Sequence, residues 1–139
     1  MLPEWPPGTV TILATAGETP HAIPVSAAIR AGSQHVLVGL AAGRGSLARL
    51  RANPRVALAI IAAEVAVTAH GHARVLDDEL LEGVVAVEIE VDHVQNHDRP
   101  TFAIEAGVRW RWTDVEAERR DREVRAGLAR LAERRTAAP

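Results

Sequence analysis

Residues 65–76 alternate between small or apolar side chains and mostly polar ones, and this period of two constrains the fold more than any other feature of the chain. Successive side chains of a β-strand point to opposite faces, so the pattern predicts one long strand with a buried face and a mixed face. The face expected to be buried carries Val65, Val67, Ala69, Gly71, Ala73 and Val75, and the other carries Ala66, Thr68, His70, His72, Arg74 and Leu76. We therefore expect a protein built mainly from β-sheet.

Five further segments are rich in apolar or β-branched residues and are bounded by turn residues, as strands are: 9–15, 21–30, 35–40, 56–61 and 84–94. The short gaps between the first three predict an antiparallel meander. We predict a mostly β fold, a closed or nearly closed barrel of six strands. A short helix over 46–53 is expected after the third strand, and a second helix is expected at the C-terminus.

Residues 77–83 are expected to form the turn of a hairpin between the last two strands. A turn centred near Leu80 places two histidines opposite acids, His72 against Glu88 and His70 against Glu90. These cross-strand pairs are the preferred interpretation of the histidines, and we expect no metal. The alternative is a metal site formed by the four histidines of this region, His70, His72, His93 and His97.

The C-terminal helix is predicted over 114–135, beginning at a sequence that resembles a capping box, residues 113–116. Its apolar stripe is narrow and suits the surface of a partner better than a core: Val124, Leu128 and Leu131. We expect one domain over 1–113, with the charged helix of 114–139 packed on that domain or on a partner subunit. Trp110 and Trp112 are interpreted as packing residues of the barrel or of an interface, and contact with a partner's cofactor is the alternative.

Composition excludes several classes of function. With 139 residues and 47% hydrophobic content, the chain can bury one core, and its net charge of −2 favours neither nucleic acid nor anionic lipid as a partner. The longest apolar run is too short to span a membrane, and no secretion signal precedes it, so a cytoplasmic protein is expected. The chain has no cysteine, and its 16 basic residues are all arginine. Thiol and Schiff-base chemistry are therefore excluded, and redox chemistry requires a bound cofactor.

The turn between the third strand and the short helix has the composition of an anion site. Gly43 and Gly45 free the backbone, Ser46 can cap the helix, and Arg44 can hold a phosphate through two hydrogen bonds. Free N–H groups at a helix start favour negative charge. The pattern is neither a Walker loop nor a dinucleotide fingerprint, and a capped surface helix with solvated arginines explains it equally well.

Three motifs, taken in order, resemble the FMN-binding split barrels related to pyridoxamine 5'-phosphate oxidase. They are Pro-His-x-x-Pro-Val in 20–25, a Gly/Arg/Ser turn ending in Leu-x-x-Asn-Pro in 43–54, and Gly-x-Ala followed by Asp-Asp in 71–78. The resemblance covers about residues 8–95 and implies a homodimeric split barrel that binds FMN at the subunit interface. It also implies an oxidoreductase that acts on a small organic molecule. The alternatives are an F420-dependent reductase of the same fold and a non-catalytic dimeric protein that binds flavin or haem.

The resemblance also implies which residues contact the cofactor. The phosphate would lie at the turn and the first part of the short helix, and the flavin ring would lie against the second strand. The family's usual phosphate-binding lysine falls at Ser46 and its preceding serine at Arg44, so charge and hydroxyl are exchanged here. No side chain stands out as a catalytic acid or base. The implied cofactor contacts are Pro24, Val25, Ser26, Leu40, Ala41, Arg44, Gly45, Ser46 and Arg49.

Overall fold

A computed structural model describes residues 1–43 and 45–137 of the chain. In chain order its strands are β1 (Thr11–Thr15), β2 (His21–Val25), β3 (Ala28–Arg30), β4 (His35–Ala41), β5 (Arg55–Ala62), β6 (Val65–Leu81) and β7 (Val84–Asn96). The helices are α1 (Gly45–Ala52), between β4 and β5, and α2 (Val115–Ala137), after a long irregular segment that follows β7. Both predicted helices are therefore present at the expected places.

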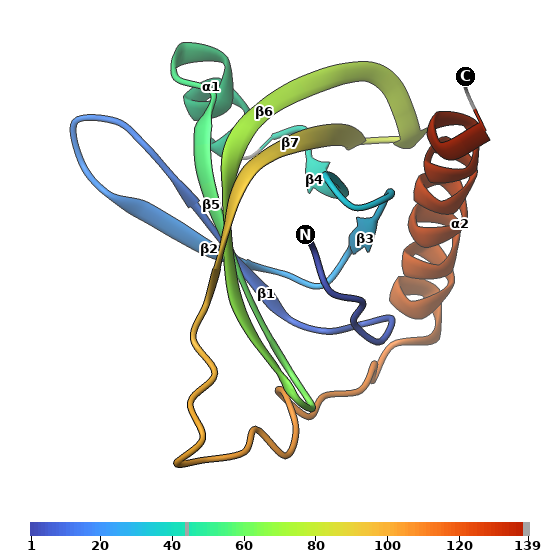
Figure 1. Ribbon diagram of the computed structural model, residues 1–139. Helices are drawn as coiled ribbons and strands as arrows, with labels where there is room; N and C mark the ends of the chain where they lie inside the picture. The colour runs from blue at the N-terminus through green and yellow to red at the C-terminus, as the bar shows by residue number, and fades with distance from the viewer. Residues whose placement is uncertain (44, 138–139) are drawn as a thin grey trace.

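The seven strands form one curled antiparallel sheet in the order β2-β1-β5-β6-β7-β4-β3 (Figure 1). This confirms a mostly β, barrel-like fold, but with seven strands instead of six. The expected strand over 21–30 breaks after Val25, because its first half pairs with β1 and its second half pairs with β4 at the opposite edge of the sheet. A hydrogen bond from the Gly39 N–H to the Ala27 carbonyl, 3.0 Å, links the connection between the two halves to β4.

The concave side of the sheet holds the main core, which contains fully buried residues of several strands, among them Leu13, Val38, Leu58 and Ile89. The first residues of the chain lie on this side (Figure 1), and Leu2 joins the core. Burial of such side chains stabilises the fold by about 2 kcal/mol each. The N-terminal segment thus covers part of the sheet that no helix reaches.

Helix α2 packs on the sheet beside β3 and β4 of its own chain (Figure 1), and this contact forms a second core. Its stripe residues Val124, Leu128 and Leu131 are all buried there, so the expectation that the stripe faces a partner is wrong. Two glycines explain how a stripe of three apolar residues is enough to pack α2 on the sheet. A Cβ on Gly39 would lie 2.8 Å from a Val124 methyl, and one on Gly127 would lie 2.9 Å from a Leu80 methyl, so both glycines let the helix approach closely.

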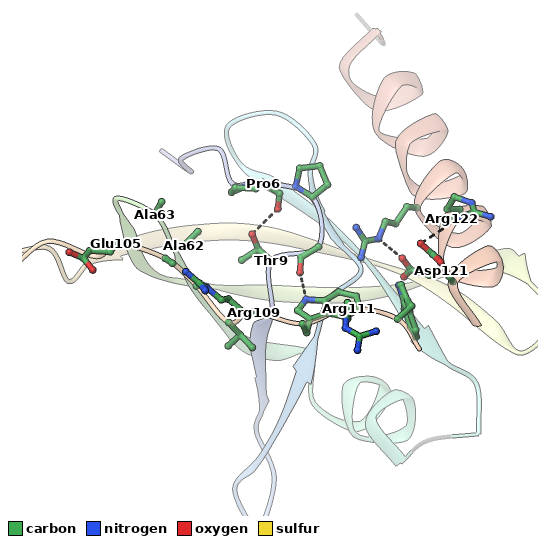
Figure 2. Close-up of a pocket in the computed structure, with 18 residues that line it drawn as sticks. Pro6, Thr9, Ala62, Ala63, Glu105, Arg109, Arg111, Asp121 and Arg122 are labelled. Carbon is green, nitrogen blue, oxygen red and sulfur yellow. Dashed lines mark hydrogen bonds and ion pairs between the residues drawn. The ribbon is translucent and has the colours of Figure 1, made fainter. Parts of the chain in front are cut away.

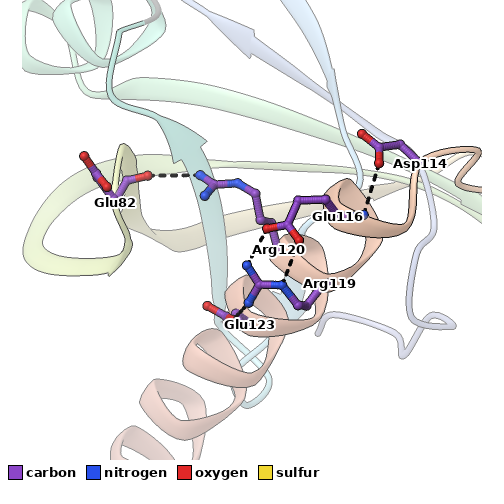
Figure 3. A network of polar contacts seen from close by, with 6 residues as sticks. All are labelled: Glu82, Asp114, Glu116, Arg119, Arg120 and Glu123. Carbon is purple, nitrogen blue, oxygen red and sulfur yellow. Dashed lines mark hydrogen bonds and ion pairs between the residues drawn. The ribbon is translucent and has the colours of Figure 1, made fainter.

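Polar contacts hold the first turns of α2 (Figure 3). The Asp114 carboxylate accepts the Glu116 N–H at 3.1 Å and caps the helix. The predicted capping box begins at Thr113, so the cap lies one residue later than expected. Arg119 pairs with both Glu116 and Glu123, and its hydrogen bond to Glu116 lowers the pKa of that carboxyl. Arg120 donates to the Glu82 carbonyl at 3.2 Å and so ties the helix to the β6–β7 turn. No helix of the described ranges is long and apolar enough to cross a membrane.

The β6–β7 hairpin differs from the prediction in both its turn and its register. Strand β6 continues to Leu81, so the turn is not at 77–83. The register places His72 opposite Glu90 and His70 opposite His93, so both predicted pairs are wrong. The pairing shifts at His70/Gly71 and again beyond Val75, and such irregularities change which residues face each other.

Candidate functional site

Five of the nine predicted cofactor contacts line one shallow cavity at the edge of the sheet. The cavity has a volume of about 180 Å³ and lies between the end of β2 and the C-terminal end of β4. Residues about fifteen positions apart in the chain meet here because β4 passes beside the connection between β2 and β3. The predicted residues that line it are Pro24, Val25, Ser26, Leu40 and Ala41, and Ile23, Ala27 and Gly39 complete the wall.

None of the residues that line this cavity ionises, and Ser26 is the one with a polar side chain. Exposed polar atoms nevertheless make up about half of the wall, so backbone groups contribute much of its surface. The side chains of Val25 and Leu40 are buried in the core, so each offers a ligand its backbone, whereas Pro24 and Ala41 are exposed. Because β2 is an edge strand, one row of its backbone groups is free, and Pro24 is tolerated there because it needs no ladder hydrogen bond. A flat, largely apolar ring with polar groups at its rim suits such a surface.

The residues predicted to hold the phosphate do not line this cavity. Gly45 begins α1 and is exposed, and a Cβ there would meet nothing within 4 Å, so a ligand has room at the helix start. Ser46 is 2% exposed. Arg49 donates to the carbonyl and the hydroxyl of Thr19 at 3.2 and 3.4 Å, which fastens α1 to the β1–β2 turn. Arg44 lies outside the described residues.

A second cavity, of about 530 Å³, adjoins the first because Ser26 lines both. It is enclosed by the N-terminal segment, β3 and α2. Its walls include Trp5, Ile29 and two arginines, Arg30 and Arg125. Sequence analysis did not find it, because its three walls are remote in the chain. The sequence near these walls offers one local indication of a binding surface, the tryptophan Trp5 close to Pro3 and Pro6.

A third cavity is an open groove of about 750 Å³ between residues 6–9, the β5–β6 turn, residues 105–112 and the start of α2 (Figure 2). Trp110 and Trp112 line it, with their rings in an edge-to-face arrangement 5.2 Å apart. The Trp110 N–H donates to the Gly8 carbonyl at 2.9 Å, so this indole fixes the long segment after β7 against the N-terminal segment. On the α2 side, Asp121 and Arg125 pair at 2.8 Å.

The histidines of β6 and β7 pair with several different groups. His72 lies 2.7 Å from the Asp92 carboxylate, His97 shares a hydrogen bond of 2.8 Å with Thr68, and the rings of His70 and His93 stack 5.7 Å apart. In the part of the chain that the structure describes, no three histidine or acidic side chains come together as metal ligands.

Comparison with known proteins identifies the fold. The sequence matches no family model and no curated protein. A presumed pyridoxamine 5'-phosphate oxidase from Listeria innocua is 16% identical, with a TM-score of 0.55 over 64% of this chain and 88% of the other. A FAD-binding protein from Mesorhizobium loti is 18% identical, with a TM-score of 0.54 over 62% and 83%. An F420 reductase is 14% identical, with a TM-score of 0.56 over 63% and 90%.

The chain therefore has the split-barrel fold of the pyridoxamine 5'-phosphate oxidase-like proteins, which confirms the recognised resemblance at the level of fold. Identities of this size say nothing of substrate or activity, since one fold serves many functions.

Proposed function

We propose that the protein is a cytoplasmic, homodimeric oxidoreductase that binds FMN at the cavity between β2 and β4 and acts on a small organic molecule. One observation carries the proposal: five residues predicted from two separate stretches of the sequence line a single cavity beside a free strand edge. The similar structures include a FAD-binding protein and an F420 reductase, so this fold accommodates flavin-type cofactors.

Each part of the site has a distinct role in this proposal. The ring would lie against the side chains and backbone that line the cavity, and the free backbone of β2 would bond the polar groups at its rim. The phosphate would lie at the start of α1, which begins at Gly45, because the backbone N–H groups of a first helical turn have no partner within the helix and can bind an anion. Arg44 would add a positive charge. FMN supplies hydride transfer when bound, and the chain positions the ring and excludes water from its apolar side.

A second copy of the chain is part of the proposal because the cavity is incomplete. Its volume of about 180 Å³ is below the roughly 300–1,000 Å³ of an ordinary ligand site. Next to it, the register of β2, β1 and β5 places Pro24, Ile12 and Ala59 in one row on the outer face, with Ile12 41% exposed. A second copy that covers this row would also close the cavity.

F420 in the same site is the second candidate, favoured by the F420 reductase of the same fold and by the open space at Gly45, which admits a longer anionic tail. Titration of the purified protein with FMN and with F420, followed by cofactor fluorescence, decides between them. A parent protein that binds neither cofactor contradicts the proposal and favours a non-catalytic role.

The phosphate assignment is tested by Arg44→Ala. A charge-assisted contact contributes about 1.5–3 kcal/mol, so the variant should bind the cofactor roughly ten-fold to a hundred-fold more weakly. Arg51→Ala, an exposed arginine of α1, is the control for general charge. Equal affinity of both variants and the parent removes Arg44 from the site.

Light scattering that gives a mass near 14.9 kDa at micromolar concentration contradicts the dimer.

A further inference from the structure

We propose that the 530 Å³ cavity beside Ser26 is the substrate pocket and that it takes a small apolar carboxylate, such as an aromatic or branched aliphatic acid. This inference rests on the proposed function for the role of substrate. The cavity itself is argued from its walls and from the two guanidinium groups in it.

The position of the cavity suits a substrate that must touch a bound ring. Ser26 belongs to the walls of both cavities, so a molecule in the larger one lies next to a ring in the smaller one. Its volume of about 530 Å³ falls within the roughly 300–1,000 Å³ of ordinary ligand sites. The two cavities together therefore offer adjoining places for two molecules.

The walls favour an apolar body. Most of the lining surface is apolar, and the apolar side chains in it come from the N-terminal segment, β3 and α2: Trp5, Ala28, Ile29, Ala126 and Ala129. The Trp5 N–H is already bonded to the Ala28 carbonyl at 3.0 Å, which fixes the indole and leaves its apolar ring for contact. A rigid wall of this kind binds without loss of side-chain entropy.

Two arginines in the walls favour a carboxylate. Arg30 uses its Nε to bond the Leu2 carbonyl at 3.1 Å, and among the described residues its guanidinium has no ion-pair partner. Two N–H-bearing nitrogens of Arg30 are thus left for a ligand, and a planar carboxylate matches a guanidinium fork. The one acid in the wall, Glu4, is exposed.

Arg125 is held in place before any ligand arrives. Its Nε lies 2.8 Å from the Asp121 carboxylate, and its side chain is 23% exposed. Its guanidinium packs over Gly8, where a Cβ would lie 3.1 Å from Nη1, and lies 6.0 Å from the centre of the Trp110 ring. Its terminal nitrogens have no hydrogen-bond acceptor within the described ranges, so they can donate to a carboxylate as well.

The probes are 2-naphthoate and its uncharged counterpart, 2-naphthalenemethanol, measured by titration calorimetry. We expect the protein to bind the acid at least about ten-fold more tightly than the alcohol, as a charge-assisted contact implies. Arg30→Gln should weaken that preference and leave the affinity for the alcohol unaffected, since Arg125 remains in the wall. Ala126→Phe, which fills the cavity from an exposed position of α2, should weaken both. Arg134→Gln, an exposed arginine of the same helix, is the matched control and should change neither.

Equal affinity for the acid and the alcohol overturns the proposal, and so does an Ala126→Phe variant that binds the acid as well as the parent does. If Arg30→Gln fails to fold, the comparison of the two probes and the Ala126→Phe variant still decide. The substrate role has its own readout: the acid should change the absorption of bound FMN or F420 in the parent and not in Ala126→Phe.

Separate titration with the cofactors distinguishes the two proposals. A protein that binds a cofactor but not the acid refutes the pocket and leaves the proposed function standing. Binding of the acid with no binding of either cofactor refutes the proposed function, and the role of the pocket as a substrate site fails with it.

Discussion

Truncation of Leu128 to alanine measures how much α2 stabilises its own sheet. The side chain is 0% exposed and packs in the second core with Leu37, Leu76 and Ala86. Leucine-to-alanine changes in cores cost about 2–5 kcal/mol, and the cost is larger where the surroundings cannot collapse into the cavity. Gly39 and Gly127 already bring helix and sheet into close contact, so little further collapse is possible here. We therefore expect a loss of about 3–5 kcal/mol.

Such a loss is a large part of the roughly 5–15 kcal/mol by which a domain is stable. Urea unfolding followed by circular dichroism measures it, and the midpoint should fall by about 1–3 M. The matched control is Val115→Ala in the first turn of α2, where the side chain is 80% exposed and the change should stay within about 0.5 kcal/mol.

The experiment is repeated at two protein concentrations, one about ten times the other. Since Leu128 contacts residues of its own chain, the difference between variant and parent should be the same at both. A loss below about 1 kcal/mol, or a difference that disappears on dilution, would refute the packing of α2 described here.

Three further predictions concern single sites. Gly71→Ala should prevent stable folding, because its Cβ would lie 2.0 Å from the Glu90 carbonyl oxygen, and the yield of soluble protein and its thermal melt check this. Asp114→Ala should cost about 1 kcal/mol by removal of the helix cap, measured by urea unfolding, and an unchanged midpoint would contradict the cap. The pKa of Glu116 is lowered by its hydrogen bond from Arg119, so its contribution to stability is present above the ordinary pKa of a glutamate and is lost as the pH falls through the lowered value. The parent should accordingly exceed Glu116→Gln in stability at neutral pH, and the difference should vanish in acid; a difference independent of pH would be inconsistent with this pairing.

Local pattern predicted most of the strands, and it failed where distant partners decide the conformation. The alternation in 65–76 marks β6 correctly, since every second side chain faces the core. The acidic residues after position 76 predicted a turn, yet β6 continues because β7 pairs with it and Leu80 packs against Gly127 of α2. The break after Val25 has the same cause, because the two halves of 21–30 pair with strands at opposite edges of the sheet.

The residues of the candidate site also fall into two groups, those that the sequence predicted and those that only the fold brings together. Pro24 and Leu40 could be predicted from the resemblance to a known family, and the fold brings them to one cavity. Trp5, Arg30 and Arg125 carry no motif, and they meet only because the N-terminal segment and α2 both pack near β3. From the sequence, the stripe of Val124, Leu128 and Leu131 was expected to face a partner. One of the two glycines that let α2 approach the sheet, Gly39, lies on β4, so the pattern of the helix alone does not reveal this contact.

The order of the strands determines when this protein can fold during its synthesis. The first part of the chain leaves the ribosome as two separate hairpins, β1–β2 and β3–β4, which have no common strand. The strands that join them, β5, β6 and β7, emerge only afterwards, and α2 emerges last of all. Until then the apolar faces of both hairpins stay in water, where they are open to aggregation and to chaperones. A nascent chain that stalls before residue 96 should therefore remain unfolded, however well its first half is made.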